Sequence, residues 1–164
     1  MKQSKAATLK RVSGRLKKFW KGQNPAFGGQ AEMVRLLVVD GEQAICRSMK
    51  EYFSLQHYEV DTAQDLVEAE RLVEARNYDV IIQDLRLGST QKPDGLEMVK
   101  FARSRNLLTR IVVLTAYGSP EMEKEAFRSG ADAFLHKPKP LSHVAQVIQG
   151  LIESPRSKQA GHGV

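Results

Sequence analysis

The chain has 164 residues and a formal net charge of +6, which suits one ordinary domain with a hydrophobic core of its own. The single cysteine, Cys46, excludes an internal disulfide and lacks the companion ligands of a zinc or redox motif, so we expect a core thiol. No apolar run approaches the roughly 20 residues that cross a bilayer, and no apolar segment follows the basic start as in a signal peptide.

Positive charge is concentrated at the N-terminus. Before the first acidic residue, Glu32, the basic residues are Lys2, Lys5, Lys10, Arg11, Arg15, Lys17, Lys18 and Lys21. This segment carries +8 and the whole chain +6, so the remainder carries about −2. The stretch QNPAFGGQ, residues 23–30, is typical of a linker. We expect a basic extension with its linker over residues 1–32, a domain over 33–153 and a flexible tail over 154–164.

The apolar residues of this extension fall close to one helical stripe, formed by Leu9, Val12, Leu16, Phe19 and Trp20. A basic amphipathic helix of this kind, over residues 1–21, can lie at an anionic membrane surface, where each cation contributes about 1 kcal/mol. Nonspecific attachment to nucleic-acid phosphates and a disordered tail are the alternatives, and Met33 leaves a later start codon open. No motif for specific DNA binding is present.

From Val34 onward, short apolar strands alternate with amphipathic helices. The predicted strands are 35–39, 58–63, 79–82, 110–116 and 133–135, and the predicted helices are about 42–56, 65–76, 96–104, 119–130 and 141–153. Proline in the first turn and glycine at the end are typical helix boundaries for the fourth helix. Five strands, each followed by a helix, predict an α/β fold: a flavodoxin-like, doubly wound parallel sheet with strand order 2-1-3-4-5.

Polar residues stand at the carboxyl ends of these strands, where ligands bind in such sheets. Asp40 follows the first strand, Asp84 follows the third, Thr115 lies at the end of the fourth and Lys137 follows the fifth. Carboxylates suit a hard cation such as Mg²⁺, whereas lysine and a hydroxyl suit phosphoryl oxygens. The pattern predicts phosphoryl transfer onto Asp84. Taken singly, Asp40 as a helix N-cap and Asp84 as a strand-end acid are the structural alternatives.

The motifs LLVVDGE, VIIQDLRL, PDGLEMV, IVVLTA and GADAFLHKP together resemble the response-regulator receiver domain, the phospho-accepting module of bacterial two-component signalling. The resemblance covers about residues 34–153. It implies that Asp84 is the phospho-acceptor, Asp40 an acid of the metal pocket and Lys137 the phosphate-binding lysine. It also implies that Thr115 and Phe134 are the switch residues.

The same resemblance implies several further features of the site. Magnesium is the expected cofactor, with the backbone carbonyl of Arg86 as a ligand beside Asp40 and Asp84. The peptide before Pro138 is expected to be cis. Arg86 and Tyr117 lie two residues beyond Asp84 and Thr115, where they either overhang the phosphoryl group and slow its hydrolysis or form a solvated rim.

Two features depart from the family pattern. Receivers usually have two adjacent acids after the first strand, but here Gly41 takes the second place, and fewer charged ligands weaken a cation site. Glu42 is either a substitute ligand or an acid of the first helical turn that the helix dipole favours. The second departure is the loop LGSTQKP, which puts Gly95 eleven positions after Asp84, farther than the family usually has it.

The sequence is compatible with two functions. The first is a single-domain response regulator that accepts a phosphoryl group on Asp84 and signals through the surface of helix 119–130, strand 133–135 and helix 141–153. Its expected partners are a sensor histidine kinase or histidine phosphotransfer protein and an unknown protein target. The alternative is a phosphorylation-independent pseudo-receiver that docks proteins or a membrane. Neither is a classical enzyme, and a nucleotide-binding enzyme is disfavoured because no glycine-rich loop follows the first strand. Either protein is expected in the cytoplasm, peripheral to the inner membrane if the extension binds lipid.

The membrane interpretation makes a direct prediction. Full-length protein should co-sediment with anionic vesicles, and a form without residues 1–30 should remain in the supernatant, because the basic and aromatic residues have been removed. Neutral vesicles serve as the control. Equal sedimentation of the two forms would contradict a membrane role for this segment.

Overall fold

The computed structural model describes residues 33–88 and 94–154. In this part of the chain the strands are β1 (Arg35–Val39), β2 (Glu59–Ala63), β3 (Val80–Gln83), β4 (Arg110–Thr115) and β5 (Ala133–His136). The helices are α2 (Gln43–Ser54), α3 (Leu66–Ala75), α4 (Gly95–Arg105), α5 (Pro120–Ser129) and α6 (Leu141–Glu153). The predicted basic extension over residues 1–32 and the tail beyond Ser154 lie outside the described residues.

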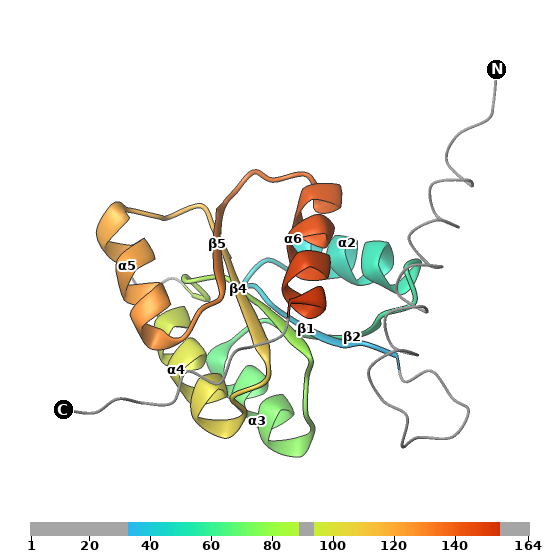
Figure 1. The fold of residues 1–164 in the computed structure, drawn as a ribbon, viewed down its shortest axis with the longest axis horizontal. Coiled ribbons are helices and arrows are strands. Elements are labelled where there is room, and N and C mark those ends of the chain that lie inside the picture. The colour runs from blue at the N-terminus through green and yellow to red at the C-terminus, as the bar shows by residue number, and fades with distance from the viewer. Residues whose placement is uncertain (1–32, 89–93, 155–164) are drawn as a thin grey trace.

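The strands form one parallel sheet with the order β2-β1-β3-β4-β5, which confirms the predicted topology (Figure 1). Neighbouring strands are in close register: Leu37 of β1 pairs with Asp61 and Ile81, and Ile81 pairs with Ile111 of β4. All strands therefore end at the same edge of the sheet, which is the edge that carries the predicted site residues.

Helix boundaries agree with the predictions to within a few residues. The largest difference is α2, which ends at Ser54 instead of Gln56. The helix stops there because the chain turns at once into β2, and His57 adopts a left-handed conformation with φ of 65°. At α5, the predicted boundaries have a clear local cause, since Ser119 accepts a hydrogen bond from Met122 N–H and Gly130 ends the helix with φ of 113°.

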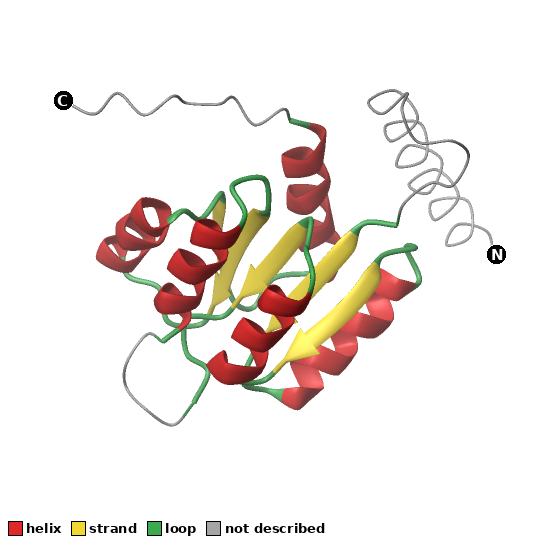
Figure 2. Ribbon diagram, turned by 90° about the horizontal axis from the view of Figure 1, so that it is seen from below, coloured by secondary structure: helices red, strands yellow, loops and turns green. Residues whose placement is uncertain are grey.

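Helices cover both faces of the sheet (Figures 1 and 2), and the side chains of the central strands divide between two cores. Leu36 and Val38 face the core that α2 and α6 cover. Leu37 and Val39 face the core that α3, α4 and α5 cover. Cys46 is buried in the first core, as predicted for a structural thiol. This alternation follows from the two-residue period of a strand and explains why the strands read as continuous apolar runs.

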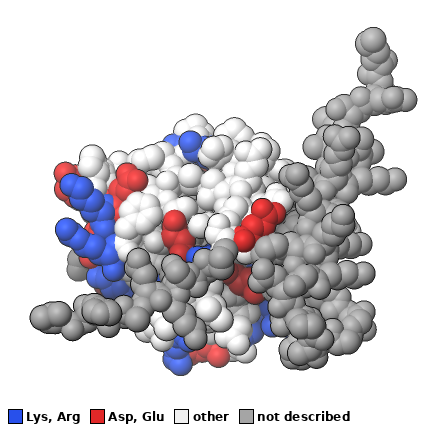
Figure 3. Space-filling model, in the orientation of Figure 1, with Lys and Arg blue, Asp and Glu red and all other residues white. Residues whose placement is uncertain are grey.

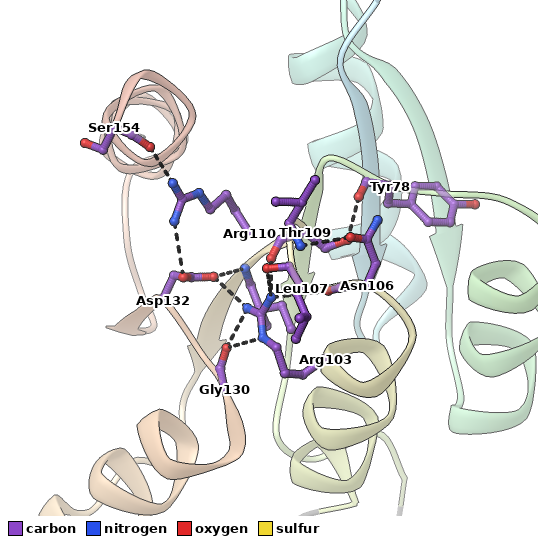
Figure 4. Close-up of polar contacts among 11 residues, drawn as sticks. Tyr78, Arg103, Asn106, Leu107, Thr109, Arg110, Gly130, Asp132 and Ser154 are labelled. Atoms are coloured by element: carbon purple, nitrogen blue, oxygen red, sulfur yellow. Dashed lines mark hydrogen bonds and ion pairs between the residues drawn. The ribbon is translucent and has the colours of Figure 1, made fainter. Parts of the chain in front are cut away.

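A polar network fastens the elements together at the edge of the sheet opposite the predicted site (Figure 4). The guanidinium of Arg103, on α4, donates to the carbonyl oxygen of Gly130 at 2.7 Å and to that of Thr109 at 2.8 Å. Arg103 also pairs with Asp132 at 2.9 Å, and Asp132 accepts from Ile111 N–H. These contacts tie the C-terminal end of α5 to α4 and to the start of β4.

None of the helices within the described ranges is long and apolar enough to span a membrane.

Gly95 allows α4 to begin directly against the backbone of the strand end at Asp84. A Cβ on Gly95 would lie 2.1 Å from the carbonyl oxygen of Asp84, which no side-chain rotation could relieve. We therefore predict that Gly95→Ala lowers the free energy of unfolding by more than about 1 kcal/mol, as measured by chemical denaturation.

Gly150 provides the matched control for this substitution. It lies within α6, and no neighbouring group in residues 33–88 or 94–154 comes within 4 Å of its ideal Cβ, so Gly150→Ala should stabilise the protein by about 0.5 to 1 kcal/mol through the better helix propensity of alanine. Equal effects of the two substitutions would show that α4 does not press on Asp84.

Candidate functional site

Three predicted residues meet at the carboxyl edge of the sheet. The Lys137 ammonium donates to Asp40 Oδ2 at 2.5 Å and to Asp84 Oδ2 at 3.1 Å. Asp40 is 3% exposed and Asp84 is 8% exposed, so both carboxylates are taken from water and share one cation. Their convergence follows from the sheet topology, because β3 lies beside β1 and the other strands follow in order.

The second oxygen of each carboxylate accepts a hydrogen bond from the backbone of the turn that follows it. Asp40 Oδ1 accepts a hydrogen bond from Glu42 N–H at 2.9 Å, and Asp84 Oδ1 accepts one from Arg86 N–H at 3.3 Å. An aspartate that bonds the backbone two residues ahead is typical of a turn that leaves a strand. The backbone therefore orients both acids toward Lys137.

Burial and pairing act against each other on these groups. Burial raises the pKa of Asp40, and the hydrogen bonds from Lys137 and Glu42 N–H offset only part of that effect. Burial lowers the pKa of Lys137, but the hydrogen bond to Asp40 and the attraction of both carboxylates outweigh it, so the lysine pKa is raised overall. The ammonium form is thus the one that the site stabilises.

Thr115 and Phe134 lie on the neighbouring strands β4 and β5. Thr115 is buried, and its Oγ1 accepts a hydrogen bond from Tyr117 N–H at 3.2 Å. Its carbonyl accepts from Lys137 N–H at 2.8 Å, which links the end of β4 to the segment that carries the lysine. Phe134 is half-buried, and its ring meets His136 edge-on with centroids 5.2 Å apart. The peptide between Lys137 and Pro138 is cis, as the family resemblance implied.

Arg86 and Tyr117 join the loops that follow β3 and β4. The guanidinium carbon of Arg86 lies 3.7 Å from the centroid of the Tyr117 ring, within the range of a cation–π contact. Tyr117 is about half exposed. The pair forms a bridge between the turns that hold Asp84 and Thr115.

Asp40 and Asp84 supply only part of the ligand set that a divalent cation needs. Mg²⁺ is commonly bound through one or two carboxylates together with backbone carbonyls and waters, and the two acids here converge on one cation, Lys137. Glu42 is not brought into this group: it is exposed at the N-cap of α2. Within residues 33–88 and 94–154, no cluster of three or more acid, histidine or cysteine side chains is arranged to hold a metal.

Gln83 is a residue of the site that the sequence reasoning missed. It is fully buried directly before Asp84, and its Nε2 donates to the Asp84 carbonyl oxygen at 2.7 Å, while its Oε1 has no hydrogen-bond partner in the part of the chain that the structure describes. This bond helps to fix the peptide that follows the carboxylate. The feature of the sequence that could have indicated this role is a glutamine at the end of an apolar strand.

Comparisons with known proteins agree with this geometry. The model of the response regulator receiver domain family matches residues 36–149. Response regulator MprA from Mycobacterium sp. (strain KMS) is 34% identical over 119 residues, which are 73% of this chain and 50% of that regulator. The chain thus spans about half the length of this curated relative.

Solved structures of similar fold include two examples with sequence identities above 25%. A response regulator from Burkholderia pseudomallei, solved with a phosphorylated aspartic acid, a calcium ion and citrate, has a TM-score of 0.67 at 27% identity, covering 73% of this chain and 68% of that chain. Chemotaxis protein CheY4 from Vibrio cholerae has a TM-score of 0.66 at 31% identity, covering 73% of this chain and 99% of that chain.

The shared cation makes a prediction about stability. Lys137→Met leaves two buried carboxylates without their ammonium, which should cost about 3 kcal/mol in the free energy of unfolding. Added Mg²⁺ should raise the melting temperature of this variant more than that of the wild type, because the ion replaces the missing positive charge.

Lys139→Met is the control, since it removes the same charge two residues away. We expect little change in its stability or in its response to Mg²⁺. Similar melting curves for the two variants would show that Lys137 does not hold the carboxylate pair together.

Proposed function

The chain belongs to the response regulator receiver domain family of two-component signalling, and we propose that its Asp84 accepts a phosphoryl group from a sensor histidine kinase or a histidine phosphotransfer protein. The observation that carries this proposal is the Lys137 ammonium, which lies within hydrogen-bonding distance of both Asp40 and Asp84. A carboxylate so placed has a positive charge ready beside any phosphoryl group that it receives.

The reaction follows from this arrangement. An oxygen of the Asp84 carboxylate attacks the phosphorus of a phosphohistidine, the new P–O bond forms as the P–N bond breaks, and the histidine nitrogen leaves with the electron pair and takes up a proton. Lys137 then neutralises charge on the phosphoryl oxygens. The Thr115 hydroxyl accepts from Tyr117 N–H and keeps its own hydrogen to donate to a phosphoryl oxygen.

A divalent cation would be held by Asp40, Asp84 and the backbone carbonyl of Arg86, and it would supply further neutralisation of the phosphoryl charge. We propose Mg²⁺ for this role because the donors are hard oxygens. The calcium ion and phosphorylated aspartate of the Burkholderia pseudomallei regulator support a divalent ion in a site of this kind.

The output is proposed to be a protein contact through α5, β5 and α6. Thr115 ends the strand that leads into α5, and Phe134 lies on β5 next to it, so a change at the phosphoryl group can shift the population of two arrangements of this surface. In the view of Figure 3, charges of both signs gather over α5, and the neighbouring surface over β5 and α6 is mostly uncharged. Phe127, a residue of α5, is 45% exposed, which suits a protein partner.

A phosphorylation-independent receiver is the second candidate. The observation that favours it is that Lys137 already pairs with both carboxylates, and no third acid among the described residues joins them. In that case the fold would serve as a constitutive docking module with the same α5–β5–α6 surface.

Phosphorylation can be measured directly by intact-protein mass. After incubation with acetyl phosphate and Mg²⁺, the wild type should gain the mass of one phosphoryl group, and omission of Mg²⁺ should reduce the yield. Asp84→Asn should gain nothing, because the amide cannot form the acyl phosphate.

Asp65→Asn is the matched control, since the Asp65 side chain caps α3 by accepting from Glu68 N–H and asparagine caps a helix equally well. This variant should be modified like the wild type. Unmodified wild type with both acetyl phosphate and a phosphorylated histidine donor would favour the constitutive module.

A further inference from the structure

Gly41 lies against the backbone of Leu87, three residues beyond Asp84. A Cβ on Gly41 would be 2.8 Å from the Leu87 carbonyl oxygen, 3.2 Å from its carbonyl carbon and 3.4 Å from its Cα. All three contacts are with backbone atoms, so rotation of a side chain cannot relieve them. Any other residue at position 41 therefore requires the segment after Asp84 to move.

The conformation of Gly41 does not itself require glycine. Among the described glycines, only Gly130 has a positive φ. An alanine at position 41 would thus meet no strain in its own backbone, and the close approach of Leu87 is the reason for glycine here.

Leu87 is also held from its other side. Its side chain is 8% exposed and packs in the core beneath α3 and α4. Between Asp84 and Leu87, the Arg86 N–H bonds to the Asp84 carboxylate. Leu87 therefore cannot yield to a side chain at position 41 without leaving the core or disturbing the turn that orients Asp84. Gly88, the next residue, has no atom of the described residues within 4 Å of its ideal Cβ.

Position 41 is also where a second acid of the cation site would stand. We propose that Gly41 is a positioning residue that seats the Leu87 carbonyl and thereby excludes an acid from this place, so that the missing acid and the backbone position of Leu87 depend on each other. This inference rests on the proposed function of the Asp40–Asp84 pair. Two carboxylates and one ammonium then give the resting site a formal charge of −1, and the neutral Leu87 carbonyl lies against the place where the Cβ of a third acid would be.

The proposal predicts that an acid added at position 41 will not improve cation binding. Charge alone would make Gly41→Asp bind Mg²⁺ more tightly. The Leu87 contact instead predicts a displaced Asp84 turn, a melting temperature lower by about 4 °C or more, and Mg²⁺ binding no tighter than in the wild type. Both quantities are measured on the full chain without any phosphoryl donor, by thermal unfolding and by titration calorimetry with MgCl₂.

Gly88→Asp is the matched control because it adds the same charge to the same segment in open space. It should melt like the wild type. A Gly41→Asp variant that melts like the wild type and binds Mg²⁺ about ten-fold more tightly would overturn the proposal, since position 41 would then be open to an acid.

Gly41→Ala keeps the test decisive if Gly41→Asp does not fold. The added methyl should lower the melting temperature in the wild-type background, and less so in a Leu87→Ala background, where the segment is no longer anchored in the core. An equal loss in both backgrounds, or no loss in either, would overturn the proposal. These measurements are independent of phosphorylation, so a failure here is distinct from a failure of Asp84 to accept a phosphoryl group.

Discussion

One ammonium group between two buried carboxylates is the interaction on which the site depends. Asp40 and Asp84 stand at the ends of adjacent strands and are almost wholly buried, so without Lys137 they would face each other as like charges in a poorly solvated place. The two acids follow strands of the parallel sheet, and the segment after β5 places the lysine beside them. With a formal charge of only −1, the resting site also opposes an anionic phosphoryl donor less than a site with a third acid would.

The fold and the central residues of the site were accessible from the sequence for simple reasons. Five apolar runs separated by helical periods imply a parallel sheet with right-handed connections, and the order 2-1-3-4-5 is the one expected of a flavodoxin-like fold. Once the order is known, residues that directly follow strands must meet at one edge. Asp40, Asp84 and Lys137 were predicted in this way, and the structure brings them together. The roles assigned to them in phosphoryl transfer stay predictions.

Other features depend on the path of a loop, which no periodicity encodes. The sequence showed that Gly41 replaces an acid and that the segment after Asp84 is long, but it could not show that Leu87 lies against Gly41. The hydrogen bond from Gln83 to the Asp84 carbonyl depends on a buried rotamer, which local pattern does not determine. The conformation of Glu42 was likewise open, since a helix N-terminus and a metal both favour an acid.

The contacts that hold the C-terminal end of α5 limit how the proposed output surface can rearrange. Arg103 and Asp132 hold the chain where α5 ends, whereas the other end of the helix follows Thr115 through a short turn. Any rotation of the helix would therefore be centred near its C-cap residue, Gly130. The helix has ten residues and is about 15 Å long, so a rotation of a few degrees about Gly130 would displace its N-terminal end by on the order of 1 Å. If Thr115 takes the proposed part in phosphorylation, a small change there would move the start of α5 sideways, while the contacts of Arg103 would hold its C-terminal end in place.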